Sequence, residues 1–265
     1  MRRLIHEDAK RQKNSNMNDY QNKIKKFAGL IRNNKTVFLT GAGASTESGI
    51  PDFRGQNGLY KQNESAEDIL SSYCLKYDTE KFYDFLRKNM DLRSFKPNSG
   101  HIAVAALEEA GFAAGVVTQN IDGLHQKAGS KKVIELHGTL GGAYCNKCHT
   151  AFSPNIIFDS KESMLICPIC KRGKIRPAIT LYGEGLPEGA YDAASELISS
   201  ANLLVVCGTS LKVNTARSLV YYYFGKYLVF INETETEFDQ YADIIFRERF
   251  GSVMGDVAKE LLMQN

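Results

Sequence analysis

The feature that most constrains the fold of this chain is a short run of β-forming residues that ends in a glycine or polar turn and recurs along the sequence. Such runs occupy residues 36–40, 115–118, 133–136, 179–182, 203–207 and 227–231. Helical apolar spacing lies between several of them, as in residues 101–109 and 191–199. Strands that alternate with helices indicate a parallel sheet with helices on both faces. We therefore expect an α/β fold with a Rossmann-like, doubly wound parallel sheet, and a ligand site just after the strand ends.

Two segments interrupt this alternation and predict a smaller lobe. Residues 52–97 contain a helical face and no convincing strand, whereas residues 141–176 contain paired cysteines. We assign these two segments to a small domain, built from a helical insertion and a zinc module. The Rossmann-like domain then comprises residues 17–51, 98–140 and 177–265. Residues 1–16 are polar and basic without an apolar period, and we expect them to form a flexible tail.

Composition and charge favour a globular protein that does not bind nucleic acid over its whole surface. Hydrophobic residues make up 43% of the chain, and the net charge is +3. Residues 1–35 hold ten Lys/Arg and three acidic residues, which we interpret as a solvated terminus in preference to a nucleic-acid-binding arm. No apolar run approaches the ~20 residues that a membrane span needs. The first residues lack the pattern of a secretory signal, so we expect a cytoplasmic protein with reduced thiols.

Four of the six cysteines form two CxxC pairs separated by eighteen residues, which are Cys145, Cys148, Cys167 and Cys170. This spacing is typical of a four-thiolate zinc site, and a site with four protein ligands has no open position for catalysis. We therefore expect one structural Zn²⁺. Two alternatives are disfavoured: a disulfide by the compartment, and a haem attachment at CNKCH by the missing export signal and the unexplained second pair. A zinc ribbon that binds nucleic acid stays open as an alternative because of the nearby lysines, although such lysines more often keep a small module soluble.

A glycine-rich turn follows the first strand. Gly41, Ala42 and Gly43 begin like a dinucleotide-binding fingerprint, but Thr46 stands where its third glycine belongs. No clear acidic residue follows a second strand about 20 residues later, as the ribose contact of ordinary dehydrogenases requires. The turn therefore permits a nucleotide phosphate, with Ser45 as an added donor, without identifying the cofactor.

Several blocks of the sequence resemble the sirtuins, the NAD-dependent protein deacylases. They are residues 41–54 (GAGASTESGIPDFR), 118–125 (TQNIDGLH), 137–138 (HG), 183–184 (GE), 208–211 (GTSL) and 231–232 (IN). They occur in the family's order and bracket the four cysteines, and the resemblance runs from about Asp19 to the C-terminus.

The resemblance implies a role for each block. Gly41, Ala42, Gly43 and Ser45 would hold the NAD pyrophosphate, and Asp52, Phe53 and Arg54 would lie on a loop over the nicotinamide ribose. Gln119, Asn120 and Asp122 would line the ribose and nicotinamide pocket, with Asn120 and Asp122 also serving catalysis. The adenosine half would lie along Gly208, Thr209, Ser210 and Asn232, with Asp256 and Val257 near the adenine.

His137 would be the general base. By analogy with the family, the acyl oxygen of an acylated lysine in a protein or peptide attacks the ribose carbon as nicotinamide leaves. A histidine, with an unperturbed pKa of about 6.5, then takes a ribose hydroxyl proton near neutral pH. The expected activity is NAD-dependent protein-lysine deacetylation. The alternatives are a protein ADP-ribosyltransferase or NADase on the same fold, and a zinc-dependent binding module.

Three positions depart from the family's pattern. Thr215 replaces a proline that usually follows the GTSL block, which affects a helix start and not the chemistry. Tyr182 stands where phenylalanine commonly precedes Gly-Glu, so that its hydroxyl would modify the acyl channel. Arg87 lies one position later than in the Tyr-x-x-Arg pair of desuccinylating members, starting here from Tyr83, and one residue turns a helix position by about 100°. We therefore predict no strong preference for acidic acyl groups.

Overall fold

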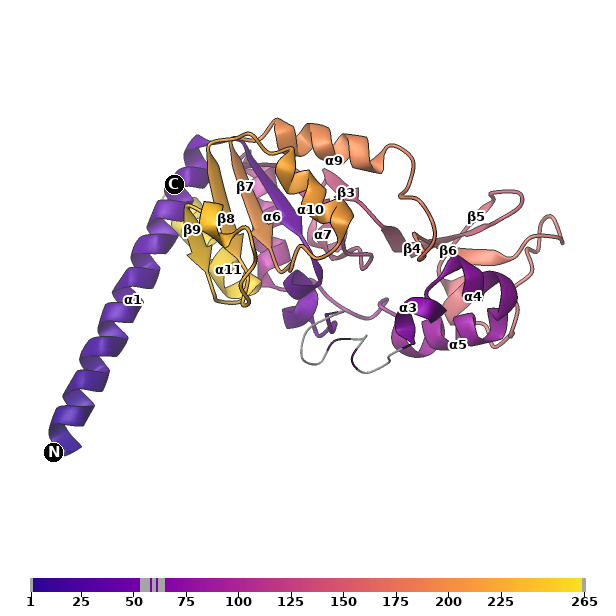
Figure 1. Cartoon of the computed structure of the whole chain (residues 1–265), viewed down its shortest axis with the longest axis horizontal. Helices are drawn as coiled ribbons and strands as arrows, with labels where there is room; N and C mark the ends of the chain where they lie inside the picture. Colours follow the sequence, from indigo (N-terminus) through magenta and orange to yellow (C-terminus); the bar gives the residue numbers. More distant parts are fainter. Residues whose placement is uncertain (1, 53–57, 59–60, 62–64, 264–265) are drawn as a thin grey trace.

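The computed structural model describes residues 2–52, 58, 61 and 65–263, with the backbone alone described for residues 2–16. Two lobes lie side by side along the long axis of the molecule, and a helix projects from the far side of the larger lobe (Figure 1). This helix, α1 (Arg2–Asn33), begins where we expected a tail without regular structure. Its second half packs on the large lobe through Ile24, Phe27 and Ile31.

A six-stranded parallel sheet forms the centre of the large lobe. Its order is β3-β2-β1-β7-β8-β9, and every neighbouring pair is parallel. The strands are β1 (Thr36–Thr40), β2 (Ala113–Thr118), β3 (Val133–Glu135), β7 (Leu203–Cys207), β8 (Tyr227–Ile231) and β9 (Ile244–Phe246). This is the doubly wound order of a Rossmann-like fold, with the direction of winding reversed between β1 and β7. The predicted fold class is therefore confirmed.

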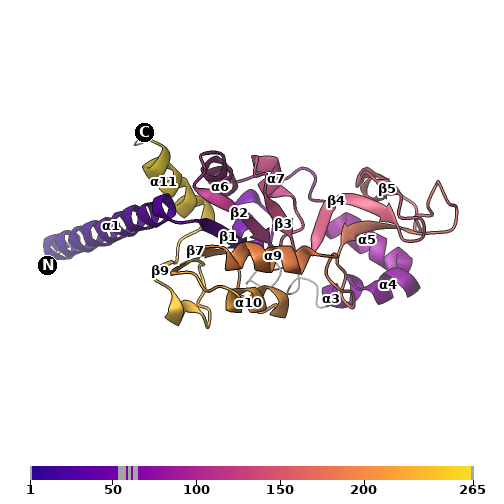
Figure 2. The same ribbon diagram turned by 90° about the horizontal axis from the view of Figure 1, so that it is seen from above.

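Alternating side chains of the buried strands build a core on each face of this sheet. Phe38 points into one core with α1, α6 (Ser99–Glu109) and α11 (Phe250–Leu262). Val37 and Leu39 point into the other core with α9 (Ala190–Ser199) and α10 (Asn214–Tyr221). Figure 2 shows the two helical layers on opposite sides of the strands. Because both faces are covered, these strands are apolar runs without a polar alternation.

The small lobe combines a three-stranded antiparallel sheet with short helices. Its sheet order is β5-β4-β6, from β5 (Ala151–Phe152), β4 (Gly138–Cys145) and β6 (Ile175–Ile179). The helices are α3 (Ala66–Ile69), α4 (Ser72–Tyr77), α5 (Thr79–Asn89) and α8 (Asn155–Phe158). Phe82, Leu86 and Leu140 belong to the same hydrophobic cluster. The helical insertion and the cysteine segment therefore share one core, separate from those of the large lobe.

One predicted strand was wrong. Residues 179–182 do not join the parallel sheet, because the strand in this region is β6, which ends at Ile179 and pairs antiparallel with β4. Arg176 and Pro177 interrupt the apolar pattern of β6, so the sequence pattern does not predict this strand. The strand β9 was not predicted. The expected domain boundaries near residues 140 and 177 fall within β4 and β6, which extend from one lobe toward the other.

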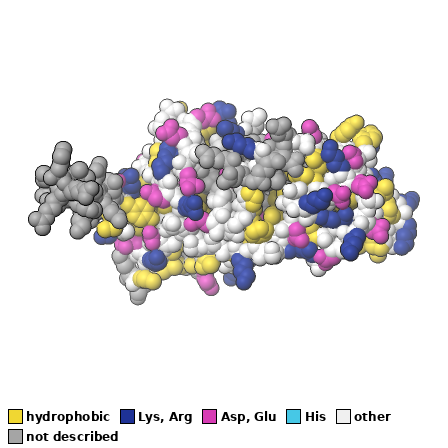
Figure 3. Space-filling model, turned by 90° about the horizontal axis from the view of Figure 1, so that it is seen from below, with side chains coloured by type: hydrophobic (Ala, Val, Ile, Leu, Met, Phe, Trp, Pro, Cys, Tyr) yellow, Lys and Arg dark blue, Asp and Glu magenta, His cyan; other side chains and the backbone are white. Residues whose placement is uncertain are grey.

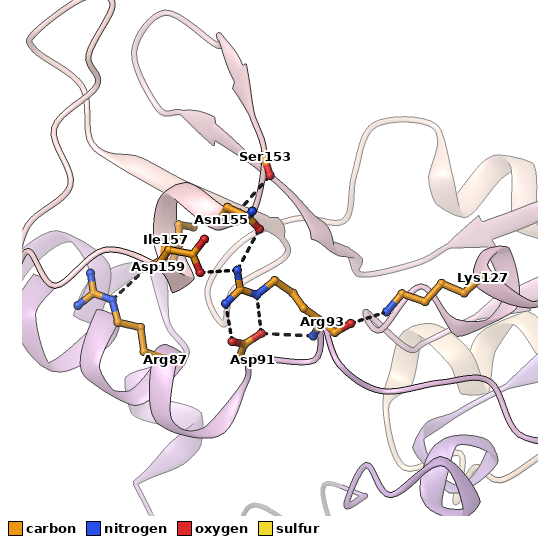
Figure 4. A network of polar contacts seen from close by, with 8 residues as sticks. All are labelled: Arg87, Asp91, Arg93, Lys127, Ser153, Asn155, Ile157 and Asp159. Carbon is orange, nitrogen blue, oxygen red and sulfur yellow. Dashed lines mark hydrogen bonds and ion pairs between the residues drawn. The ribbon is translucent and has the colours of Figure 1, made fainter.

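A cluster of polar contacts around Arg93 links three parts of the chain (Figure 4). Its guanidinium bonds both oxygens of Asp91 at 2.8 Å and reaches Asp159 at 2.6 Å, after the zinc-module helix α8. Lys127 of α7 (Leu124–Ala128), in the large lobe, donates to the Arg93 carbonyl at 3.5 Å. Arg93 lies in the segment that joins α5 of the small lobe to α6 of the large lobe, and these contacts attach that segment to both lobes.

On the face in Figure 3, basic and acidic side chains are interspersed. Among the described helices, none is long and apolar enough to cross a membrane.

Candidate active site between the two lobes

A cavity of about 690 Å³ lies where the carboxyl ends of the parallel strands meet the small lobe. Its large-lobe wall comes from the turns after β1, β2, β7 and β8 and from the turn before α11. Its small-lobe wall comes from Leu70, Met90 and residues 179–184, together with Leu186. The volume is within the ~300–1,000 Å³ usual for small-molecule sites, and the position is the switch point at which open parallel sheets bind ligands.

The glycine turn after β1 packs against the turn after β7. A Cβ on Gly43 would lie 2.8 Å from the Gly208 Cα, and a Cβ on Gly208 would lie 2.2 Å from the Ala44 nitrogen. Gly208 also has φ +58°, in the left-handed region that favours glycine. The amides of Gly41 and Gly43 donate to the carbonyls of Cys207 and Gly208. Ala42 and Gly43 line the cavity. The main role of Gly43 and Gly208 is structural, because only residues without a Cβ allow the two turns to pack this closely.

A buried hydrogen-bond network fixes the turn after β2. The Asn120 side-chain amide donates to the Gly41 carbonyl at 3.0 Å and to Ser45 Oγ at 3.1 Å. Ser45 Oγ in turn donates to Asp122 Oδ2 at 2.6 Å, and Asp122 Oδ1 accepts the Leu124 amide. Asn120 lines the cavity, whereas Ser45 and Asp122 lie behind it. These two residues therefore position the wall of the site.

His137 follows β3 and contributes its half-buried imidazole to the same cavity. Its Nδ1 lies 2.9 Å from the Gln119 carbonyl oxygen. A carbonyl only accepts hydrogen bonds, so Nδ1 carries the proton and Nε2 has a free lone pair. Burial lowers the pKa of His137 below its ordinary value, and the bond to Gln119 opposes part of this shift. The geometry therefore presents a neutral imidazole that can accept a proton near pH 7.

The turns after β7 and β8 form the other end of the cavity. Gln119 Nε2 donates to Thr209 Oγ1 at 2.9 Å and so ties the β2 turn to the β7 turn. Thr209, Ser210 and Asn232 line the cavity, and the side-chain amide of Asn232 donates to the Thr234 carbonyl at 2.7 Å.

Some predicted site residues lie elsewhere. Asp256 and Val257 do not line the cavity: the Asp256 carboxylate accepts the Tyr20 hydroxyl at 3.0 Å, and Val257 is fully buried. Asp52 lines the cavity, while Phe53 and Arg54 lie outside the described residues. Sequence reasoning missed Glu248, Arg249 and Phe250, which line the cavity after β9.

A partly buried ion pair holds the small-lobe wall. Arg176 donates through both terminal nitrogens to Glu184, at 2.5 and 2.7 Å, and Glu184 Oε2 also accepts the Leu181 amide at 3.0 Å. Burial would raise the pKa of Glu184, but the bonds from Arg176 and Leu181 outweigh this effect and lower it. Tyr182 lies on the loop so formed, lines the cavity, and has its hydroxyl 3.4 Å from Glu67 Oε1.

Tyr83 and Arg87 face the zinc module and do not line the cavity. Tyr83 is fully buried and donates its hydroxyl to the Ile175 carbonyl. The Arg87 guanidinium donates to the carbonyls of Ile157 and Glu162 at 3.0 and 2.6 Å. Neither side chain is therefore available to bind an acidic acyl group in the cavity.

The four predicted cysteine ligands come together in the small lobe. Their sulfur atoms all lie within 4.8 Å of one another, at 3.6 Å for Cys145 and Cys170 and at 3.8 Å for Cys148 and Cys167. A tetrahedron with Zn–S bonds of about 2.3 Å has sulfurs about 3.8 Å apart, whereas a disulfide needs about 2.05 Å. A Cβ on Gly173 would lie 2.3 Å from Cys145 Sγ. The arrangement fits a structural Zn²⁺, as the spacing predicts.

The fold and the site define a class: Rossmann-like α/β proteins whose ligand cavity lies between the sheet and a four-cysteine lobe. The comparisons with known proteins place the chain within this class. Residues 41–215 match the model of the Sir2 family, and the chain belongs to that family.

Individual relatives and structures agree with this assignment. A protein of Clostridium tetani named NAD-dependent protein deacetylase is 43% identical over 242 residues, which cover 89% of this chain and 98% of the relative. A structure of a Sir2 variant with deacetylated p53 peptide and 3′-O-acetyl ADP-ribose has a TM-score of 0.82 at 37% identity, covering 91% of this chain and 98% of that one. Sir2Tm bound to a propionylated peptide has a TM-score of 0.80 at 37% identity, with 89% and 98% covered.

Proposed function

We propose that this chain is an NAD-dependent protein-lysine deacetylase that transfers the acetyl group to ADP-ribose and releases nicotinamide. Relatives that align over nearly the whole chain carry the name NAD-dependent protein deacetylase, and a related structure contains an acetylated ADP-ribose. The single observation that carries the proposal is the imidazole of His137. It lies in the wall of the 690 Å³ cavity, with Nδ1 bonded to the Gln119 carbonyl and with no partner for Nε2 among the described residues.

The residues of the cavity fit NAD and an acyl-lysine side chain. The turns at residues 42–43 and 208–210 would hold the pyrophosphate and adenosine, and Gln119 and Asn120 would contact the nicotinamide ribose. Leu70, Met90 and Leu181 give the small-lobe wall an apolar surface suited to an acyl chain. NAD, when bound, supplies a glycosidic bond whose cleavage leaves an electrophilic ribose carbon.

The protein's own residues would accept one proton and hold the turn at the site in position. With NAD bound, His137 Nε2 would accept a proton from a ribose hydroxyl and so allow attack on the acyl carbon. The Gln119 carbonyl would stabilise the resulting imidazolium through the Nδ1–H bond. Asn120 and Asp122 hold the turn in place through Ser45. A Zn²⁺ on the four thiolates would fix the small lobe without joining the reaction.

The test is a matched pair of histidine substitutions. We expect wild type to release nicotinamide and deacetylated peptide from NAD and an acetyl-lysine peptide, and His137→Asn to form deacetylated peptide about 10²–10⁴-fold more slowly. His149→Asn is the control, because His149 is exposed on the zinc module with φ +58°, which asparagine tolerates. Nicotinamide release that does not depend on peptide would contradict deacetylation and indicate an NADase or ADP-ribosyltransferase.

We also propose that the chain is located in the cytoplasm, which is a reducing compartment. The six cysteines are free, and zinc binding by the quartet requires reduced thiols. Fractionation of cells that express the tagged chain tests this proposal, and recovery outside the cytoplasmic fraction would contradict it.

A further inference from the structure

We propose that Arg93 is a positioning residue for deacetylation, because it holds the small-lobe wall of the cavity in place opposite the large-lobe wall; this inference rests on the proposed function. Arg93 itself does not line the cavity. It lies in the joining segment, residues 90–98, which connects α5 of the small lobe to α6 of the large lobe. Its side chain fixes this segment to the small lobe, and other residues of the segment reach the cavity.

The Arg93 guanidinium uses three of its nitrogens to hold the joining segment on the zinc module (Figure 4). Nε and Nη2 bond the two oxygens of Asp91 at 2.8 Å, within the segment itself. Nη1 bonds Asn155 Oδ1 at 2.9 Å, at the start of α8, and Asp159 Oδ1 at 2.6 Å, just after its end. The guanidinium carbon also lies 5.2 Å from the centroid of the Phe158 ring. A planar, forked guanidinium can make these contacts together, whereas a lysine ammonium cannot.

The joining segment extends this anchor to the cavity and to the glycine turn. Met90, at its start, lines the cavity. Phe95 packs against Gly49, since a Cβ on Gly49 would lie 3.3 Å from the Phe95 ring. Gly49 ends the short helical turn at residues 42–48, part of which lines the cavity. At the end of the segment, the Asn98 side-chain amide donates to the Ala44 carbonyl of the same turn at 2.8 Å.

A further contact connects the joining segment to the turn after β2. Lys127 Nζ donates to the carbonyls of Arg93 and Phe95, each at 3.5 Å. Lys127 belongs to α7, which follows the turn that contains Asn120 and Asp122. The joining segment therefore contacts both turns that the proposed NAD site uses near the ribose. Loss of the Arg93 anchor would let the small-lobe wall shift against them, and a shift of about 1 Å can slow a reaction by as much as about 10²-fold.

The exposure of these ion pairs separates an effect on the reaction from an effect on folding. The Arg93 side chain is 33% exposed, and that of Asp159 is 57% exposed. Ion pairs with this exposure contribute little to the free energy of unfolding. Arg93→Met should therefore fold, and methionine keeps a long apolar side chain beside the Phe158 ring. The variant should differ from wild type in how firmly the joining segment is held.

The experiment compares deacetylation with binding of ADP-ribose, which the turns of the large lobe would hold. Arg93→Met should lower kcat for an acetyl-lysine peptide by about three- to thirtyfold, whereas the Kd of ADP-ribose, measured by calorimetry, should change by less than about twofold. Arg93→Lys should have an intermediate kcat, since the ammonium keeps the charge without the fork. Asp159→Asn should lower kcat less than Arg93→Met does, and combining the two should cause little further loss, because both remove the same contact.

The control is Arg217→Met, which removes a similarly exposed ion pair, with Glu237, within the large lobe. It should leave kcat and the Kd of ADP-ribose unchanged. A wild-type kcat in Arg93→Met would show that the positioning role is wrong while the proposed function stands. Loss of ADP-ribose binding, or of zinc measured by atomic absorption, in Arg93→Met and Asp159→Asn would indicate a general role in folding and would also overturn it. If wild type binds ADP-ribose but deacetylates no peptide, the proposed function fails and this inference fails with it.

Discussion

Replacing Glu184 by glutamine tests the partly buried ion pair that holds the small-lobe wall. The change removes a negative charge beside Arg176 while keeping the shape of the side chain. Glu184 now accepts two bonds from Arg176 and one from the Leu181 amide. Glutamine offers one oxygen, and its NH₂ group would face a donor. Arg176 Nε is already buried without a hydrogen-bond partner among the described residues. The guanidinium would keep its bond to the Ile179 carbonyl but lose the carboxylate that balances its charge.

The magnitude follows from burial. Removing one partner of a fully buried pair costs about 3–5 kcal/mol. The Arg176 side chain is 10% exposed, but that of Glu184 is 25% exposed, so solvent screens part of the loss. We expect the free energy of unfolding to fall by about 2–3 kcal/mol at pH 7. The pair's own contribution should disappear as the pH falls below about 4.3 and through the lower pKa of folded Glu184, since protonation removes the charge.

Urea denaturation followed by circular dichroism, with zinc present, measures this loss. The control is Glu188→Gln, an exposed position on the following loop, which should change stability by less than about 0.5 kcal/mol. Replacing both members, as Arg176→Met with Glu184→Gln, should cost less than Glu184→Gln alone, because no buried charge is left unpaired. Equal stability of Glu184→Gln and Glu188→Gln would refute the reasoning.

Three further outcomes are expected. Gly208→Ala should lower the free energy of unfolding by about 2 kcal/mol or more and weaken ADP-ribose binding, because its Cβ would meet the Ala44 nitrogen at 2.2 Å in a left-handed conformation, whereas Gly185→Ala, with open space around it, should be tolerated. Cys167→Ser should reduce zinc, measured by atomic absorption, well below the one ion per chain expected of wild type, and full occupancy would contradict the four-thiolate site. An acetyl-lysine peptide should have a higher kcat/KM than its succinyl counterpart, because Arg87 is bonded within the zinc module, and the reverse order would overturn that assignment.

Long apolar strands were predictable from the sequence, and short or interrupted ones were not. Residues 36–40, 203–207 and 227–231 match β1, β7 and β8 residue for residue, because both faces of these central strands are buried. The strand β9 has three residues between Asp243 and Arg247, too few to show a pattern. Because β9 was not predicted, the turn after it was not predicted either, and that turn forms the cavity wall at residues 248–250.

The candidate site was predictable where a local pattern carried it. The polar turns after the correctly predicted parallel strands, including Asn120, His137 and Thr209, lie at the cavity, because parallel strands end at one edge of a sheet. The cysteine quartet followed from spacing alone. In contrast, the Arg176–Glu184 pair and the approach of Gly43 to Gly208 depend on how separate segments meet in space. No local signal in the sequence predicts them.

The pH dependence of kcat/KM for deacetylation tests the role of His137 most directly, because this quantity reports the pKa values of the free enzyme. Burial lowers the pKa of His137 below 6.5, so the acid limb of the profile should have its midpoint below that value, and His137→Asn should abolish it. An acid limb centred above pH 6.5, or one that persists in His137→Asn, would contradict a neutral imidazole that takes the proton in the cavity.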